Sequence, residues 1–332
     1  MSYLDIQRKR KNCIPVLTEV NKLEFVSSFV CNICDSSEIV VLSDLDRYGL
    51  KIRSGLCKNC GLVFLIDRLT KSGYWEFYST GLYRKLVSAY NEKEVTNEGI
   101  YNMQKYFARN LIYVFDESFA DHKDGRMLDI GGSSGNIAKV LREKYNFDLT
   151  ILDPAESELN YKSSHNIKLI HSFIEDLNLT EIKYDVILLY QTIDHLFDLR
   201  KSLRNINKLL DENGIFIFDI LDFSLCCNYG PPDNFLKIDH CFYLSREIIE
   251  TTMASFGFSV SIVDINTNPF HTTFLCKKVS PSIFSNNHNN LFCDDLISKI
   301  RKWQYDSPSY NFKDKLKVGL YKFKKMLISK AE

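Results

Sequence analysis

The sequence has little glycine and proline, and it lacks any long run of uncharged apolar residues. Glycine accounts for only 14 and proline for only 7 of the 332 residues, which excludes a collagen-like or low-complexity chain. No apolar run approaches the roughly 18 residues that a membrane-spanning helix needs, and none follows the basic start MSYLDIQRKRKN as a secretory signal would require. We therefore expect a soluble, cytoplasmic protein.

The chain also lacks net charge, because 42 Lys and Arg balance 42 Asp and Glu. A neutral chain does not have the electrostatic footprint of a nucleic-acid binder, so we expect no nucleic-acid partner. Hydrophobic residues make up 45% and charged residues 25%, which is a globular composition. The length is enough for about two domains.

Ten cysteines need an explanation in a reducing cytoplasm, where structural disulfides are rare. Four of them form two C-x-x-C pairs, Cys31 with Cys34 and Cys57 with Cys60, and such paired knuckles are typical of a tetrahedral metal site. We predict a structural zinc ion, since four thiolates leave no open position for catalysis. The alternative is two chance pairs of buried thiols.

The first 97 residues divide into three segments. Residues 1–22 are predicted to be a loosely ordered arm, and residues 23–70 a zinc ribbon of short strands around the cysteines. Residues 71–97 form an unusually aromatic connecting segment, in which Tyr78 and Tyr83 are candidates for closing a substrate pocket. The alternative is a hydrophobic strap that packs the ribbon onto the next domain.

Residues 98–278 predict an α/β domain. Apolar residues at three- and four-residue steps predict a helix over 97–119. Beyond it, apolar runs alternate with helical stretches, which predicts a parallel, doubly wound sheet with an antiparallel pair at its end. The expected strands are 127–130, 149–152, 167–170, 186–190, 215–220, 258–265 and 272–278, and the expected helices lie around 135–145, 155–164, 199–210 and 246–256.

A turn of small residues, from Gly131 to Gly135, follows the first of these strands. Small residues let the backbone approach a ligand closely, and the helix that follows offers free N–H groups. Asp153 closes the second strand, where a carboxylate could accept both hydroxyls of a ribose. The turn of small residues, the acid at the end of the second strand and the alternation of strands and helices together predict a nucleotide-type ligand at the carboxyl edge of the sheet.

With Asp129 two residues ahead of it, the turn resembles the motif acid-x-G-x-G-x-G of the class I S-adenosylmethionine (SAM)-dependent methyltransferases, with serine in place of the middle glycine. The resemblance covers about residues 98–278 and implies a Rossmann-like, seven-stranded domain after the small zinc ribbon. A Rossmann-like dehydrogenase is the alternative. The residues that the resemblance assigns to SAM binding are Asp129, Gly131, Ser133, Gly135, Asp153, Phe173, Ile174 and Gln191.

The chain combines this domain with the ribbon, the aromatic segment and the stretch Asp239-His240-Cys241-Phe242-Tyr243. In this combination it resembles the zinc-containing methyltransferases of deoxysugar and polysaccharide pathways. Some of these methylate a carbon of a nucleotide-linked sugar, and a Glu-His pair of their active site matches Asp239-His240. The aspartate and the short chain after residue 278 leave O-methylation equally open. The resemblance implies methyl transfer to a hydroxyl, or to a carbon next to a keto group, of a sugar, nucleotide sugar or glycan end.

Methyl transfer requires a group that removes a proton from the acceptor. His195 and His240 both fall at the carboxyl edge of the predicted sheet and are candidate bases. The candidate catalytic set also contains Asp239, Tyr78 and Tyr83. Alternatively, His240 only organises the turn before the next helix, and His195 is a polar residue at a helix start.

Residues 279–332 are predicted to form a C-terminal extension. Residues 313–330 place leucine and phenylalanine on one helical face and lysine on the others. Such a basic amphipathic helix could make weak contact with an anionic membrane surface, at the inner face of the membrane. The alternative is a helix docked on the protein by its apolar stripe.

Two other functions compete with sugar methylation. One is an RNA methyltransferase that uses the ribbon to hold RNA, against which the balanced charge argues. The other is a SAM-binding scaffold without catalytic activity, against which the intact turn and Asp153 argue.

Overall fold

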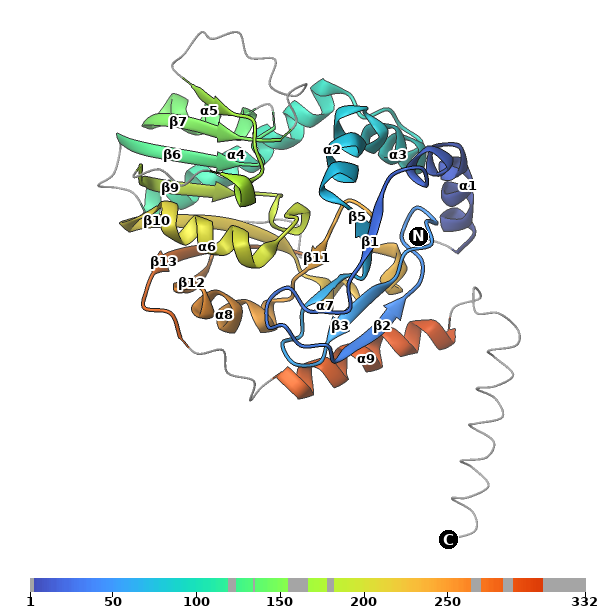
Figure 1. The fold of residues 1–332 in the computed structure, drawn as a ribbon. Helices are drawn as coiled ribbons and strands as arrows, with labels where there is room; N and C mark the ends of the chain where they lie inside the picture. Colours follow the sequence, from blue (N-terminus) through green and yellow to red (C-terminus); the bar gives the residue numbers. More distant parts are fainter. Residues whose placement is uncertain are drawn as a thin grey trace.

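The structure is a computed structural model, which describes residues 3–118, 124–133, 135–154, 167–177, 182–263, 270–282 and 289–306. Its main element is a seven-stranded sheet in the order β12-β13-β10-β9-β6-β7-β8 (Figure 1). The parallel strands are β6 (Asp124–Ile130), β7 (Asn146–Leu152), β8 (Lys168–Ile170), β9 (Tyr184–Leu189) and β10 (Leu210–Leu221). β13 (His271–Lys278) pairs antiparallel with β10 and with β12 (Phe258–Val263). This confirms the predicted Rossmann-like sheet and its antiparallel end.

Helices cover both faces of the sheet, because its central strands are apolar on both sides. Val186 and Leu188 of β9 pack in one core cluster with α4 (Asn97–Ser118) and α5 (Asn136–Lys144). Ile187 and Leu189, which alternate with them, pack in the other cluster with α6 (Leu199–Leu209) and α8 (Arg246–Ser255). The helix expected around 155–164 lies outside the described residues.

The cysteine-bearing module is completed by a distant part of the chain. β2 (Ile39–Ser43), β3 (Ser54–Cys57) and β4 (Val63–Leu65) form an antiparallel sheet whose fourth strand, β11 (Phe242–Tyr243), follows β10. β1 (Phe25–Ser27) pairs with β5 (Asp67–Leu69) beside it. The module predicted over residues 23–70 is therefore tied by backbone hydrogen bonds to the segment that contains His240.

The N-terminal segment is a helix, so the prediction of a loosely ordered arm over residues 1–22 is wrong for its described part. α1 (Tyr3–Val20) buries Cys13, Leu17 and Val20 and packs on α3 (Leu82–Asn91). Arg10, which is also buried, donates to the carbonyl of Asp46. Because Arg10 occupies one of the buried positions of α1, a charged residue interrupts the three- and four-residue spacing of its apolar residues.

The aromatic segment forms a helical hairpin. α2 (Lys71–Ser79) and α3 contact each other, and α2 also contacts β5 of the module. Tyr74, Phe77 and Tyr90 are buried in the main core. The predicted strap is therefore a folded part of the core, and Tyr78 and Tyr83 project from it half-buried.

The C-terminal extension returns to the cysteine module. α9 (Asn289–Asp306) buries Leu296 and Ile300, and its Cys293 thiol donates to the carbonyl of Lys58 at 3.5 Å. Trp303 Nε1 donates to the carbonyl of Cys227 at 2.6 Å, just after α7 (Phe223–Cys226). The basic helix predicted over residues 313–330 lies outside the described part of the chain.

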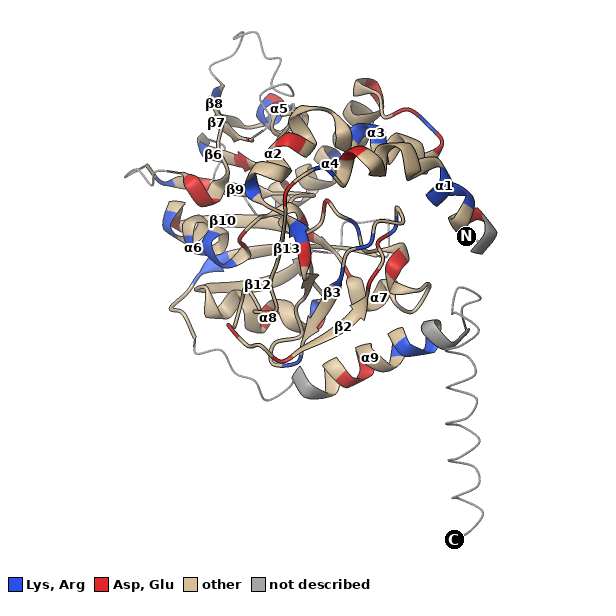
Figure 2. Cartoon of the chain, turned by 45° about the vertical axis from the view of Figure 1, so that its right-hand side comes forward, with Lys and Arg blue, Asp and Glu red and all other residues tan. Residues whose placement is uncertain are grey.

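Charged residues of both signs are interspersed over the helices (Figure 2). Within the ranges that the structure describes, no helix is both long and apolar enough to cross a bilayer.

Candidate active site

A cleft of about 1380 Å³ lies beside the carboxyl ends of β6, β7 and β9. The loops after these strands form one wall, and α2, α3 and α4 form the other. The strand order reverses at β6, and ligands of doubly wound sheets bind at such a switch point.

The loop after β6 is held in a conformation that its small residues permit. Gly131 has a φ of +69°, and a Cβ there would lie 2.3 Å from Thr192 Cγ2. Ser133 has a φ of +48°, and its N–H donates to Asp153 Oδ2 at 2.8 Å. Gly135, with a φ of +65°, begins α5 behind the loop. The loop and the end of β7 are therefore joined at one corner of the cleft.

Asp129 is a buried carboxylate at the same corner. Its Oδ2 atom has no hydrogen-bond partner among the described groups, although the residue lines the cleft. Burial, with a smaller effect from the charge of Asp153, raises the pKa of Asp129 to about 7. A cationic ligand would stabilise its ionised form.

The other residues expected to bind SAM also reach this cleft. Phe173 and Ile174 line it next to Asp153, and Lys71 Nζ lies 4.7 Å from the centre of the Phe173 ring. Gln191 lines it too, but its amide N–H group donates to Asp219. Of the eight expected residues, seven line the cleft, and Gly135 is the one behind it.

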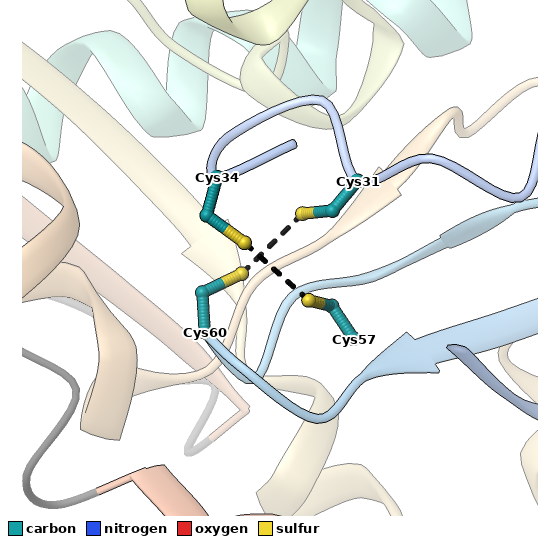
Figure 3. Close-up of side chains that lie close together, drawn as sticks. All are labelled: Cys31, Cys34, Cys57 and Cys60. Atoms are coloured by element: carbon teal, nitrogen blue, oxygen red, sulfur yellow. Dashed lines mark hydrogen bonds between the residues drawn. The ribbon is translucent and has the colours of Figure 1, made fainter. Parts of the chain in front are cut away.

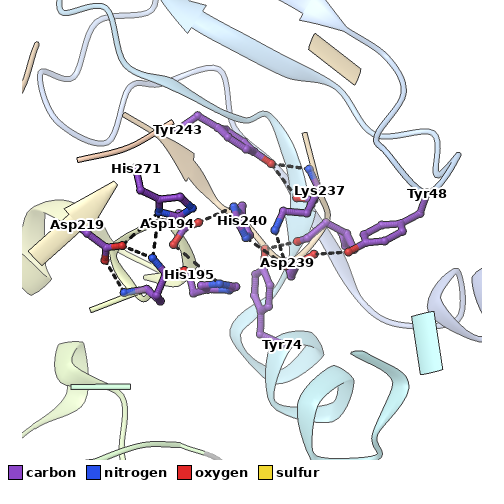
Figure 4. Close-up of polar contacts among 12 residues, drawn as sticks. Tyr48, Tyr74, Asp194, His195, Asp219, Lys237, Asp239, His240, Tyr243 and His271 are labelled. Carbon is purple, nitrogen blue, oxygen red and sulfur yellow. Dashed lines mark hydrogen bonds and ion pairs between the residues drawn. The ribbon is translucent and has the colours of Figure 1, made fainter. Parts of the chain in front are cut away.

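The two Asp-His pairs lie side by side (Figure 4), and one of their four residues, His195, lines the cleft. Asp194 and His195 follow β9, whereas Asp239 and His240 precede β11. The imidazole rings of His195 and His240 lie 4.4 Å apart, centroid to centroid. Asp194 Oδ2 lies 2.6 Å from His240 Nδ1, so the aspartate of one pair contacts the histidine of the other. The Cys241 N–H donates to the Asp194 carbonyl and fixes the two segments together.

His240 is buried between two carboxylates. Its Nε2 lies 3.3 Å from Asp239 Oδ2, and only 5% of the residue is exposed. Burial lowers the pKa of His240 to about 4, so the ring is neutral at pH 7. Burial alone would raise the pKa of Asp194, but the two histidines hold it below its usual range. His240 and Asp239 therefore lie behind the cleft wall.

His195 is the histidine at the cleft wall. It lines the cleft together with Tyr78 and Tyr83, and its Nδ1 lies 3.0 Å from the Tyr78 hydroxyl. The Tyr78 and Tyr83 rings are 5.1 Å apart. Burial raises the pKa of Tyr78 well above its ordinary value, so its hydroxyl stays protonated at neutral pH.

Sequence reasoning missed two contacts of Asp239. Lys237 Nζ lies 3.6 Å from Asp239 Oδ2, and the Tyr48 hydroxyl donates to Oδ1 at 3.4 Å. Lys237 is two positions before Asp239, and this nearness in the sequence is a signal that could have found the contact. Tyr48 comes from the cysteine module, 191 positions away, and nothing in the sequence links the two.

The four cysteines of the two knuckles converge (Figure 3). The Sγ atoms of Cys31 and Cys60 are 3.4 Å apart, those of Cys34 and Cys57 are 3.5 Å apart, and all four lie within 4.8 Å of one another. Tetrahedral zinc, with Zn–S bonds of about 2.3 Å, separates its sulfur ligands by about 3.8 Å. The spacing suits such an ion and is far too long for disulfides, whose S–S bond is about 2.05 Å.

Comparison with known proteins finds a methyltransferase family and relatives that are named for acceptors other than sugars. Residues 100–261 match the family model described as "Methyltransferase domain". The malonyl-[acyl-carrier protein] O-methyltransferase of Bacillus anthracis is 28% identical over 137 residues, which cover 40% of this chain and 51% of that protein. The ubiquinone biosynthesis O-methyltransferase of Rickettsia bellii is 28% identical over 118 residues, 34% of this chain and 48% of that protein. The chain thus spans about half the length of these curated relatives.

Among solved structures, human N-acetylserotonin methyltransferase in complex with SAM aligns with a TM-score of 0.45 and 14% identity, covering 62% of this chain and 58% of that one. A SAM-dependent methyltransferase from Clostridium acetobutylicum aligns with a TM-score of 0.44 and 18% identity, covering 62% and 99%. On the family match and the topology of its sheet, the chain carries a Rossmann-like methyltransferase domain.

Proposed function

We propose that the protein transfers a methyl group from SAM to an acceptor held beside His195. The observation that carries this proposal is the presence of two sets of residues in one cleft: the loop with Asp129 and Asp153 at one corner, and His195 with Tyr78 at the other. The relatives from Bacillus anthracis and Rickettsia bellii are both O-methyltransferases by name, which supports the reaction class.

The residues of the first corner suit SAM. The Asp153 carboxylate would accept the ribose hydroxyls, and Phe173 and Ile174 would flank the adenine. Asp129, buried and with a partnerless oxygen, would face the positive charge that SAM carries. When bound, SAM supplies a methyl group already activated on its sulfonium, so the protein must mainly orient the acceptor and accept one proton.

His195 is the base in this proposal. If its Nδ1–H donates to the Tyr78 oxygen, Nε2 is left unprotonated to accept the proton of the acceptor. His240 and Asp239 act behind it: His240 holds Asp194 next to the His195 ring. Tyr83 packs on Tyr78 and shields the reacting groups from water.

For the acceptor we propose a hydroxyl, or a carbon next to a keto group, of a sugar, nucleotide sugar or glycan end, in surface polysaccharide or deoxysugar biosynthesis. The support is the arrangement shared with the sugar methyltransferases: a four-cysteine module, an aromatic segment, and an acid-His pair next to the cleft. We further propose that the module holds zinc in a structural role, since all four thiolates face one point.

Incubation of the protein with labelled SAM and a panel of nucleotide sugars, sugar phosphates and lipid-linked glycans tests the function. The expected result is one class of methylated product, identified by mass spectrometry. Methylation of malonyl or quinone precursors instead would contradict the proposed sugar acceptor but would agree with the proposed methyl transfer from SAM. Absence of SAM binding would contradict both.

Replacing Asp153 with alanine is expected to weaken binding of S-adenosylhomocysteine (SAH) about 10- to 100-fold. The ribose hydroxyls lose a charged acceptor, and such hydrogen bonds contribute roughly 1.5–3 kcal/mol each. Calorimetry measures the affinity. Asp148→Ala, an exposed residue of the same strand, is the matched control and should bind as the wild type does. Equal affinity in the two variants would remove Asp153 from the site.

SAM affinity is expected to rise as pH rises through 7. Asp129, whose pKa is raised to about 7, is largely protonated at pH 6, and a cationic ligand favours its ionised form. Binding should therefore release up to about half a proton at pH 7 and nearly one at pH 6, which calorimetry in buffers of different ionisation enthalpy detects. Asp129→Asn should abolish the release. Proton uptake, or no linkage between pH 6 and 8, would contradict this role.

A further inference from the structure

The cleft continues beyond the two corners as an apolar wall between α3 and α4. This wall consists of Val87, Val95, Ile100, Met103 and Phe107. Ile100, Met103 and Phe107 recur at steps of three and four residues, so one face of α4 turns toward the cleft. Met103 is 51% exposed and the other four side chains are half-buried, so the wall is partly open to solvent.

The wall is continuous with the candidate acceptor corner. Val87 lies one helical turn after Tyr83 on α3, and both line the same cleft. Arg84, the basic residue of α3 that also lines it, donates to Asn97 Oδ1 at 2.7 Å, at the start of α4. A ligand at His195 can therefore extend along α3 over apolar side chains and end near a polar rim.

The size of the cleft leaves room for such a ligand. A pocket for one small ligand usually encloses roughly 300–1,000 Å³, whereas this cleft has about 1380 Å³. The donor occupies the corner formed by the loop after β6. An acceptor that consisted of a polar group alone would leave the α3–α4 wall in contact with water, which is unfavourable for five apolar side chains.

We infer that the acceptor is amphipathic: its reacting group lies beside His195 and Tyr78, and an apolar chain attached to that group lies along the α3–α4 wall. This inference rests on the proposed function, because it assigns the acceptor of the same site. Lipid-linked sugars and long-chain acyl thioesters share the required chemistry. The wall contributes affinity by burying the apolar chain of the acceptor. Each two methylene groups of that chain that it buries should raise the affinity by up to about tenfold.

Two series of probes distinguish these sources. Methyl, hexyl, octyl and decyl glucosides represent a sugar head, and acetyl, hexanoyl and decanoyl pantetheine represent a thioester head. Each is titrated by calorimetry, below its micelle concentration, into the full chain saturated with SAH. Affinity should rise several-fold for each two carbons in at least one series, and the tighter series identifies the head. Affinity independent of chain length in both series would overturn the inference.

Two variants of α4 test whether an effect comes from the apolar wall or from any change to the helix. Met103→Glu should weaken binding of the longest probe at least tenfold and leave SAH affinity unchanged. Tyr113→Glu, on the same helix and 64% exposed away from the cleft lining, should change neither. Equal loss of SAH binding in Met103→Glu would assign the wall to the donor and overturn the inference. Lack of SAH binding by the wild type, seen before any probe is added, would instead overturn the proposed function.

Discussion

Replacing Cys60 with serine is expected to abolish zinc binding and to destabilise the chain by roughly 4–5 kcal/mol or more. The four strands of the module's sheet contain only two to five residues each, too few for a strong core of their own. The binding free energy of a structural zinc ion is therefore folding free energy of the module. Loss of one of the four thiolates opens the coordination shell and removes most of this binding free energy.

The loss should spread beyond the module, because two distant segments are built onto it. β11 pairs with β4, and α9 packs against the knuckle that carries Cys57 and Cys60. Without the metal, both lose their support, and with β11 the adjacent His240 is no longer held in place. Turnover is therefore expected to fall together with stability, although none of the four cysteines belongs to the candidate catalytic set.

Metal analysis and thermal unfolding measure this effect. The midpoint of unfolding of Cys60→Ser should fall by at least about 10 °C. Cys226→Ala, which alters an equally buried cysteine outside the cluster, should retain zinc and lose only a small part of its stability. A wild-type protein without zinc, or a Cys60→Ser variant that unfolds at the same temperature, would contradict the structural role of the metal.

Replacing His195 with alanine is expected to reduce turnover about 10²- to 10⁴-fold, the usual contribution of a positioned base. Its ring is the one histidine among the described residues that lines the cleft, and it is held by Tyr78 and next to Asp194. SAH affinity should stay nearly unchanged, because the donor corner does not include His195.

Two further variants decide which histidine is the base. His171→Ala, an exposed histidine outside the cleft, is the matched control and should have wild-type turnover. His240→Asn should lose less than His195→Ala, since it acts only by holding Asp194. A greater loss in His240→Asn, with His195→Ala near wild type, would assign the proton transfer to His240 instead.

The parts of the fold that follow from local patterns were predictable. Apolar runs that alternate with helical stretches gave the strands of the sheet, and the small residues from Gly131 to Gly135 gave the loop. The paired C-x-x-C spacing predicted that the four thiols would meet. In each case the pattern lies within a few neighbouring residues, because the periodicity of a strand and the spacing of a C-x-x-C pair are local features of the sequence.

The parts that depend on contacts between distant segments were not predictable in this way. β11 contains only two residues, and its pairing with β4 has no sequence signature. That pairing places Asp239 and His240 behind His195, and Asp194 then contacts His240 as well as its own neighbour His195. The sequence therefore pointed to both histidines as candidates, but it could not show that His195 lines the cleft and that His240 lies behind it.

A crystal structure of the full chain grown with SAH is the most direct test of where the donor binds. We expect the ribose hydroxyls within hydrogen-bond distance of Asp153, the adenine beside Phe173, and the sulfur directed toward His195 and Tyr78. SAH bound outside the cleft, or with its sulfur turned away from His195, would contradict the assignment of donor and acceptor corners.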